Sequence, residues 1–255
     1  MNYPRRTLVR EILVSKPFTS LKELEERFPE VSSMTLRRDI EFFESQGDVI
    51  KVRKGARSMK FITTTMEESF SERLNENMEL KRKIAAKALA FIESGRSIFL
   101  DSGTTALELA KIIDNNRLSI ITSGPNVAIT LSQNDRIMVN LLGGLLSRDN
   151  LSVSGVSTLE QVAKINIDIA FIVPSGFSLK DGFTCGNYNE CELKQAIIKK
   201  AEKTVMLLDS QKVGKSLPYT FAALSGVSAI ITDSKLDPAI KNAAEQQNIE
   251  IIIAE

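Results

Sequence analysis

Apolar positions in the first 46 residues recur with the period of short amphipathic helices. A first helix is expected over residues 4–14, and Lys16-Pro17 breaks it. A second begins after Ser20, which is placed as an N-cap with Glu23 three residues on, the spacing of a capping box. A third runs from the N-cap Ser32 to about residue 46 and stops at a glycine. We expect its inward face to carry Met34, Leu36 and Ile40.

Alternating residues after the third helix predict two short strands, within 48–53 and 60–62, around a basic turn at 54–56. Three short helices followed by a basic hairpin are typical of a winged helix-turn-helix, in which the third helix enters the major groove of DNA.

From residue 97 onward, short apolar runs alternate with helical patterns. The runs are nearly continuous, as in parallel strands buried on both faces, and their alternation with helices predicts a doubly wound, mostly parallel α/β domain. Strands are expected at 97–100, 119–122, 137–142, 167–173, 205–208, 229–232 and 249–254. Helices are expected at 79–93, 104–113, 126–133, 157–164, 191–203 and 238–246.

These patterns divide the chain into three parts. We expect a DNA-binding domain over residues 1–62, a polar linker over 63–80 and an effector-sensing α/β domain over 81–255. No apolar run is long enough for a membrane span and the start has no signal-like apolar core, so we expect a cytoplasmic protein that does not contact membranes.

Charge and composition limit the kinds of site that the chain can form. Residues 1–60 hold 13 Lys/Arg against 9 Asp/Glu, and the remainder 20 against 23, so the basic excess lies where DNA binding is expected. The chain has no histidine, which removes the commonest general base. Its two cysteines, Cys185 and Cys191, are too few for a disulfide framework or a zinc site, and we expect reduced thiols, no metal and no cofactor.

The start of the third helix carries side chains that suit DNA. Hydroxyl and guanidinium groups there reach base edges and phosphates, whereas the alternative is an ordinary amphipathic surface helix. The basic hairpin adds phosphate contacts. The expected DNA-binding residues are Ser32, Ser33, Thr35, Arg37, Arg38, Lys51, Arg53 and Lys54, and the expected partner is double-stranded operator DNA.

The turn Asp101-Ser102-Gly103-Thr104-Thr105 lies between an expected strand and an expected helix. A glycine, hydroxyl donors and a helix N-terminus together suit a phosphate, whereas the alternative is a capped strand-to-helix turn. Ser123-Gly124 and Gly143-Gly144 follow the next two strands, at the edge where open α/β sheets bind ligands.

Residues 28–47, with the core Val-Ser-x-Met-Thr-Leu-Arg-Arg-Asp-Ile, resemble the helix-turn-helix of DeoR-family bacterial regulators. The resemblance continues through Phe70-Ser-Glu-Arg73, the 101–105 turn, Asp168–Phe171, Glu190-x-x-x-Lys194 and Leu208–Lys212. It implies a sensor domain similar to ribose-5-phosphate isomerase, a phosphorylated sugar or related metabolite as effector, and regulation of carbohydrate metabolism.

The resemblance also places Glu190 and Lys212 at the effector, although both equally fit a surface carboxylate and a surface lysine. Two motifs depart from the family. Its usual His-Gly-Gly-Ala wing is Arg53-Lys54-Gly55-Ala56 here, and Val173-Pro174 stand where a glycine is usual. The first breaks the glycine pair and removes the histidine, and the second stiffens a loop expected beside the pocket.

We therefore expect a non-enzymatic regulator, most simply a repressor, that acts as a homodimer or homotetramer and whose operator affinity depends on the effector. One alternative is a sugar-phosphate isomerase with an N-terminal extension, because Asp101, Asp168, Glu190 and Lys212 are available for proton transfer. Another is an architectural DNA binder that senses nothing.

Overall fold

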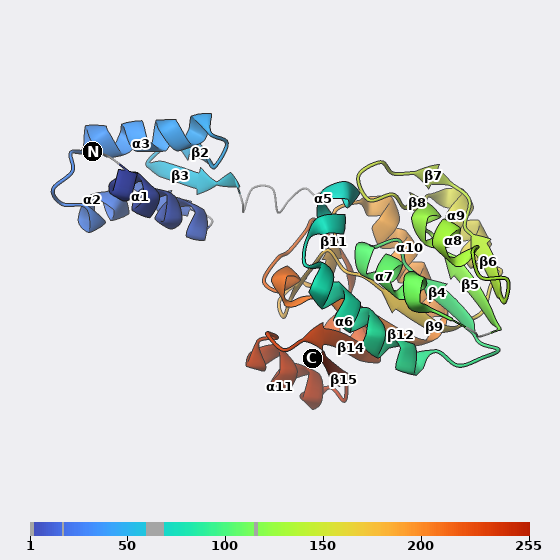
Figure 1. Ribbon diagram of the computed structural model, residues 1–255. Helices are drawn as coiled ribbons and strands as arrows, with labels where there is room; N and C mark the ends of the chain where they lie inside the picture. The colour runs from blue at the N-terminus through green and yellow to red at the C-terminus, as the bar shows by residue number, and fades with distance from the viewer. Residues whose placement is uncertain (1–2, 17, 60–68, 115–116) are drawn as a thin grey trace. The chain divides into compact units, whose positions relative to one another are not determined.

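The computed structural model describes residues 3–16, 18–59, 69–114 and 117–255 of the 255-residue chain. The chain divides into two compact units, Met1–Met66 and Glu67–Glu255, each with its own core (Figure 1).

The N-terminal unit is a winged helix-turn-helix. Val9, Leu24, Leu36 and Phe43 are among the residues of its core. Ser20 and Ser32 cap α2 and α3 as expected, each accepting a hydrogen bond from the backbone three residues on. The side chain of Glu23 pairs with Lys16. The elements are α1 (Tyr3–Ser15), β1 (Phe18–Ser20), α2 (Leu21–Arg27), α3 (Ser33–Ser45), β2 (Val49–Val52) and β3 (Gly55–Ser58).

The wing differs from the expected hairpin. Its second strand is β3, directly after a turn at Arg53-Lys54, whereas residues 60–62 lie outside the described residues. The sequence pattern also missed β1, which pairs with β3 to complete a three-stranded antiparallel sheet. Gly55 makes this pairing possible, because a Cβ there would lie 2.1 Å from the carbonyl oxygen of Thr19.

The expected inward position of Met34 is wrong. Its side chain is 62% exposed, whereas Leu36 and Ile40 are buried. An α-helix turns about 100° per residue, which places Met34 opposite the buried face formed by Leu36, Asp39, Ile40 and Phe43.

The predicted linker extends too far toward the C-terminus. Residues 69–80 hold α5 (Phe70–Asn75) and the start of α6 (Met78–Ala88). Phe70 is buried in the core of the C-terminal unit, and Ser69 caps α5 in a complete capping box with Glu72.

The seven predicted strands form one sheet in the order β15-β14-β12-β9-β4-β5-β6, with every described neighbour pair parallel. The order reverses direction at β4, as in doubly wound folds. The strands are β4 (Ser97–Leu100), β5 (Leu118–Thr122), β6 (Ile137–Leu141), β9 (Ile167–Ile172), β12 (Ala201–Leu208), β14 (Ala229–Asp233) and β15 (Glu250–Ala254).

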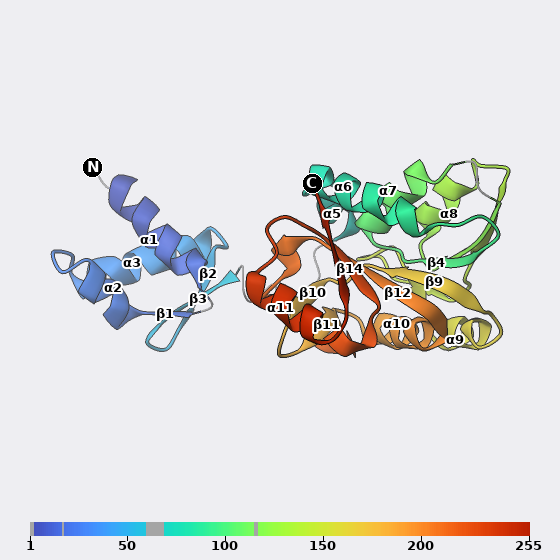
Figure 2. The same ribbon diagram turned by 90° about the horizontal axis from the view of Figure 1, so that it is seen from below.

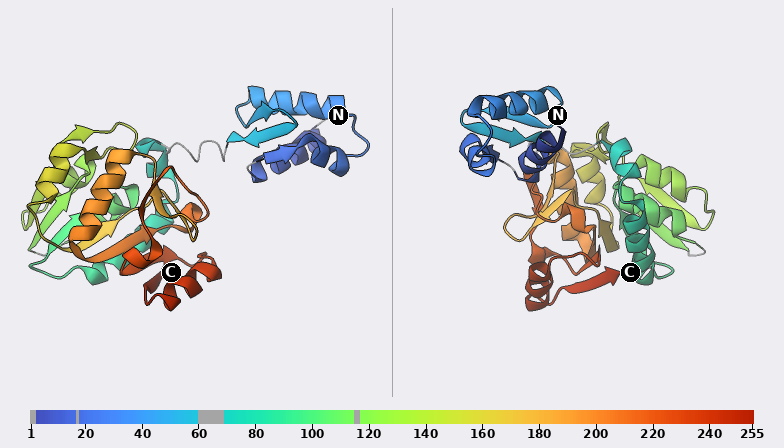
Figure 3. Two further views of the ribbon diagram at one scale, coloured as in Figure 1. Left: turned by 180° about the vertical axis from the view of Figure 1, so that it is seen from behind. Right: turned by 60° about the vertical axis from the view of Figure 1, so that its left-hand side comes forward.

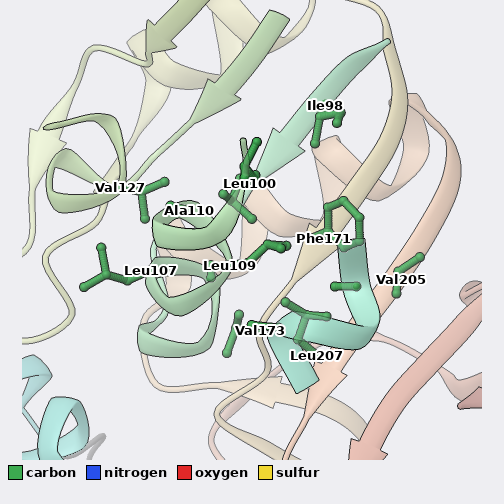
Figure 4. Packing of buried hydrophobic residues seen from close by; sticks show 14 of the residues in the cluster. Ile98, Leu100, Leu107, Leu109, Ala110, Val127, Phe171, Val173, Val205 and Leu207 are labelled. Carbon is green, nitrogen blue, oxygen red and sulfur yellow. The ribbon is translucent and has the colours of Figure 1, made fainter. Parts of the chain in front are cut away.

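Helices cover both faces of this sheet (Figures 2 and 3). On one face, α5 to α8 pack on the cluster shown in Figure 4, which contains Ile98, Leu100 and Phe171. On the other, α9 to α11 pack on a second cluster with Phe99, Ile172 and Met206. The helices not yet bounded are α7 (Thr104–Ile112), α8 (Pro125–Leu131), α9 (Val156–Val162), α10 (Tyr188–Lys200) and α11 (Pro238–Gln246).

Two details depart from the expected pattern. Helix α10 begins three residues earlier than predicted, at an N-cap on Asn187, and residues 201–203 belong to β12. Short antiparallel strands were also missed: β7 (Leu145–Leu146) with β8 (Val153–Ser154), and a three-stranded sheet of β10 (Gly176–Ser178), β11 (Gly182–Cys185) and β13 (Tyr219–Ala222).

Candidate functional sites

The exposed face of α3 gathers most of the residues expected to read DNA. Ser33, Arg37 and Arg38 are exposed on it. Ser32 has a structural task as well, because its hydroxyl oxygen accepts from the Thr35 amide at 3.3 Å and lies 2.9 Å from the Thr35 hydroxyl. The two arginines and Ser33 are thus exposed polar groups in the first turns of this helix.

A buried carboxylate on the opposite face fixes α3 against α1. Asp39 is 1% exposed. It accepts from Arg5 at 3.0 and 3.2 Å and from Arg6 at 2.9 Å. Charge-assisted bonds of this kind are directional, so they set the angle at which α3 is presented. The sequence reading missed this contact because Asp39 resembled one more polar surface residue.

The wing presents its basic residues unequally. Lys51 is paired with Glu41 of α3 at 2.5 Å, and its backbone amide donates to Glu44. Arg53 and Lys54 are exposed in the turn, where Lys54 has a φ of 80°. The turn residues are therefore better placed than Lys51 to meet phosphate.

In the C-terminal unit, the turn from Asp101 to Thr105 connects the end of β4 to the start of α7. Helix α7 begins after Gly103, and no side chain among the described residues caps its first turn, whereas Asn187 caps α10. The hydroxyl oxygens of Thr105 and Ser123 are buried and have no hydrogen-bond partner among the described residues. Buried hydroxyls usually have partners, so this edge holds hydrogen-bonding capacity that the described residues leave unused.

Glycines let the neighbouring loops approach closely at this edge. A Cβ on Gly103 would lie 2.7 Å from the side chain of Val173, and one on Gly124 would lie 2.8 Å from the Cα of Ser102. The ends of β4, β5 and β9 therefore meet, as the sequence predicted for parallel strands. These two glycines are required because the loops pack closely on one another.

A buried lysine joins two of the expected effector residues. The ammonium of Lys194 lies 2.5 Å from Asp101 and 3.1 Å from Glu190, and all three side chains are at most 6% exposed. It also donates to the carbonyl of Val173 at 2.8 Å. Burial alone would lower the pKa of Lys194, but the two carboxylates raise it above its usual value.

Asp101 faces this cluster. One carboxylate oxygen accepts from the Ser102 amide at 2.8 Å, and the other accepts from the Val173 amide at 2.9 Å as well as from Lys194. Asp101 therefore orders its own turn.

Asn150 completes the cluster from a distant part of the chain. Its side-chain amide donates to Glu190, and its own oxygen accepts from the Ser152 hydroxyl at 3.2 Å. Neither Lys194 nor Asn150 was singled out as a site residue from the sequence. The signal for Lys194 was its spacing of four from Glu190, which places both on one helical face.

The remaining residues expected at the effector, Gly143, Gly144 and Lys212, contact residues outside the Lys194 cluster. Gly143 accepts from Thr158 and Gln161 of α9, and a Cβ on Gly144 would lie 2.2 Å from the Thr158 hydroxyl. Lys212 follows β12, and its ammonium nitrogen lies 3.5 Å from a carboxylate oxygen of Asp209. Near it, burial and the charge of Lys212 lower the pKa of Lys81 to about 8.

The two cysteines are buried, and burial raises the pKa of both thiols. Thiolates are the reactive form, so the structure favours the packing role expected for them.

Family models match both units. The "DeoR-like helix-turn-helix domain" matches residues 5–61, and the "DeoR C terminal sensor domain" matches residues 76–234. The chain is 32% identical over 90% of both chains to the HTH-type transcriptional regulator GolR of Listeria innocua. It is 30% identical, over 89% of this chain and 86% of the relative, to the HTH-type transcriptional repressor GlcR of Bacillus subtilis.

Among solved structures, ribose 5-phosphate isomerase A of Methanocaldococcus jannaschii matches 55% of this chain and 56% of its own, with 19% identity and a TM-score of 0.41. In the described part of the chain, no helix is long and apolar enough to cross a membrane. The same residues form no cluster of acidic or sulfur side chains able to hold a metal ion.

Proposed function

Because the chain belongs to the DeoR family of DNA-binding transcription regulators, we propose that it is a repressor whose operator affinity is set by a phosphorylated sugar or a related metabolite. The phosphate would bind at the 101–105 turn, and the sugar hydroxyls would face Glu190. A homodimer or homotetramer would present one α3 to each half-site, and binding of the effector would shift the population of DNA-competent arrangements.

The uncapped first turn of α7 is the observation that carries this proposal. Free backbone N–H groups and the helix dipole attract an anion at a helix N-terminus. Beside that turn lie the hydroxyls of Thr105 and Ser123, which have no partner within the described part of the chain. A phosphate accepts hydrogen bonds from both kinds of donor, so it would satisfy groups that have no partner among the described residues.

Glu190 is not arranged as the base of an isomerase. A general base needs a carboxylate oxygen within reach of the substrate proton. One oxygen of Glu190 pairs with Lys194 and the other accepts from Asn150. This arrangement suits recognition of a hydroxyl group better than proton transfer.

The DNA-binding half is tested by removing the two exposed arginines of α3. A footprint on the DNA upstream of the chain's own gene defines the operator duplex. Arg37→Ala with Arg38→Ala is expected to abolish binding to that duplex in a fluorescence anisotropy titration. The control, Arg117→Ala with Lys199→Ala, removes two exposed charges from the C-terminal unit and should bind normally. A normal footprint by the α3 variant would refute this assignment of the DNA-reading helix.

The effector half is tested with phosphorylated sugars and their unphosphorylated counterparts. We expect one phosphorylated sugar to change operator affinity, and Thr105→Val with Ser123→Ala to weaken that response at least tenfold in sugar concentration. Thr130→Val is the matched control, since it removes a hydroxyl that bonds within α8. An undiminished response in the Thr105 and Ser123 variant would move the phosphate elsewhere.

A further inference from the structure

The turn between β7 and β8 makes contacts in two directions. It is closed by the Ser147 amide, which donates to the Ser152 carbonyl at 2.9 Å. From it, the Asn150 side chain reaches Glu190. The carbonyl of Asp149 accepts the backbone N–H of Phe70 at 2.6 Å. The Asp149 carbonyl and the backbone nitrogen of Asn150 belong to one rigid peptide unit. Movement of the Asn150 backbone therefore also moves the carbonyl that accepts the hydrogen bond from Phe70.

The turn also holds a residue in an unfavourable conformation. Leu151 has a φ of 48°, in the left-handed region that a leucine rarely adopts, and its half-buried side chain packs on the core beneath α5 to α8. Such a conformation is unfavourable and persists only where the surrounding contacts hold it. Loss of the contact between Asn150 and Glu190 would remove one of those contacts, so the turn is suited to take up a second arrangement.

Phe70 stands where the chain enters the sensor unit. It is the first residue of α5 and is 5% exposed, and it is the fourth residue of the unit that begins at Glu67. The hydrogen bond from its backbone N–H to the Asp149 carbonyl connects the start of this unit to the turn. The contacts therefore run without interruption from Glu190 through Asn150 and Asp149 to Phe70.

We propose that Asn150 is a positioning residue that transmits the state of Glu190 to the start of the sensor unit. A ligand hydroxyl that donates to Glu190 takes the place of the Asn150 amide, the strained turn rearranges, and the bond to the Phe70 amide is lost. The role of the ligand rests on the proposed function, whereas the contacts from Asn150 to Phe70 can be tested without any ligand.

Asn150→Ala in the full chain breaks the first contact directly. Without any sugar, we expect hydrogen exchange of the Phe70 amide to accelerate at least tenfold. We also expect operator affinity to change at least fivefold, the lower end of typical coupling between sites. Asn134→Ala is the matched control, because Asn134 orders a turn elsewhere in the unit by accepting from the Arg136 amide. It should alter neither quantity.

Ser152→Ala provides a second variant should Asn150→Ala fail to fold. It removes the hydroxyl that orients Asn150 and should change both quantities in the same direction by a smaller factor. Operator affinity within twofold of the unchanged protein, or an unaltered Phe70 amide, overturns the proposal. If no sugar phosphate alters operator affinity but Asn150→Ala does, the proposed effector fails and this inference stands.

A separate observation concerns the reading of the operator. Met34 lies at the centre of the exposed face of α3, between Arg37 and Arg38, in the first turn of the helix. The first turn of a recognition helix contacts base edges, and the apolar group that the major groove offers is the C5 methyl of thymine. We infer that Met34 is a specificity-determining residue that packs on a thymine methyl group in each half-site.

Replacing each operator thymine in turn by uracil removes only that methyl group. At one thymine per half-site we expect affinity to fall about fourfold, because the burial of one carbon atom is lost. Met34→Ala should bind the thymine and uracil duplexes equally, whereas Leu8→Ala, another exposed apolar residue of this unit, should retain the difference. A Met34→Ala protein that still discriminates as the unchanged protein does, or an unchanged protein indifferent to every substitution, overturns the inference.

Discussion

Replacing Lys194 by methionine leaves Asp101 and Glu190 buried without the cation that lies between them. The side chains are 2%, 3% and 6% exposed, and the ammonium lies 2.5 and 3.1 Å from the two carboxylates. Removing one partner of a buried ion pair typically costs about 3–5 kcal/mol, because the remaining charge is left uncompensated. We therefore expect Lys194→Met to lower the free energy of unfolding by about 4 kcal/mol at pH 7.5.

Urea unfolding followed by tyrosine fluorescence measures this change, since two of the three tyrosines, Tyr188 and Tyr219, lie in the sensor unit. With a slope of about 2 kcal/mol/M, the midpoint should fall by about 2 M. Lys199→Met is the matched control. It removes an exposed lysine from the same helix, and changes at such surface positions stay within about 0.5 kcal/mol.

The loss should also depend on pH. Without Lys194, the buried site favours the protonated carboxyl groups, so the variant binds more protons when folded than when unfolded. Its stability then falls as pH rises, by linkage. The deficit relative to the unchanged protein should thus be smaller at pH 5 than at pH 7.5. Equal effects of the two lysine substitutions, or a deficit that does not shrink at pH 5, would refute a charge-compensating role for Lys194.

Three further predictions concern stability. Gly55→Ala should destabilise the N-terminal unit by more than about 2 kcal/mol in thermal unfolding, because its Cβ would meet the Thr19 carbonyl; a change below 0.5 kcal/mol would contradict the pairing of β1 with β3. Asp39→Ala leaves Arg5 and Arg6 without their shared carboxylate, and should lower the melting temperature of that unit and its operator affinity together. Lys81 has a pKa of about 8 against 10.5 for an ordinary lysine, so the unfolded chain holds more protons between these values; the unchanged protein should gain about 2 kcal/mol relative to Lys81→Met from pH 8 to 10, and a difference independent of pH would contradict the burial of a charged lysine.

Much of the fold could be predicted from the sequence because its signals are local. All seven strands of the parallel sheet appear as apolar runs, and the caps at Ser20 and Ser32 stand directly before their helices. The missed strands are two to four residues long and depend on distant partners. Strand β1, for example, pairs with β3 almost forty residues away, and no pattern within three residues indicates such pairing.

The sites were predictable in part, for the same reason. The 101–105 turn could be located because a strand, a glycine and a helix start are adjacent in sequence. Its interactions could not, since Lys194 reaches Asp101 across 93 positions and Asn150 reaches Glu190 across 40. A lysine is normally read as a surface residue, and only the packing of α10 on the sheet shows that this one is buried. Met34 was assigned inward because it is apolar, although helical geometry places it outward.

Operator binding by the full chain, titrated with phosphorylated sugars and their unphosphorylated counterparts, measures whether a phosphorylated ligand controls DNA binding. We expect one phosphorylated sugar to change the operator Kd by about 5- to 150-fold, its unphosphorylated form to leave the Kd unchanged, and Thr105→Val with Ser123→Ala to weaken the response. An operator Kd that no phosphorylated sugar alters, or that the unphosphorylated sugar alters equally, would refute control by a phosphorylated sugar.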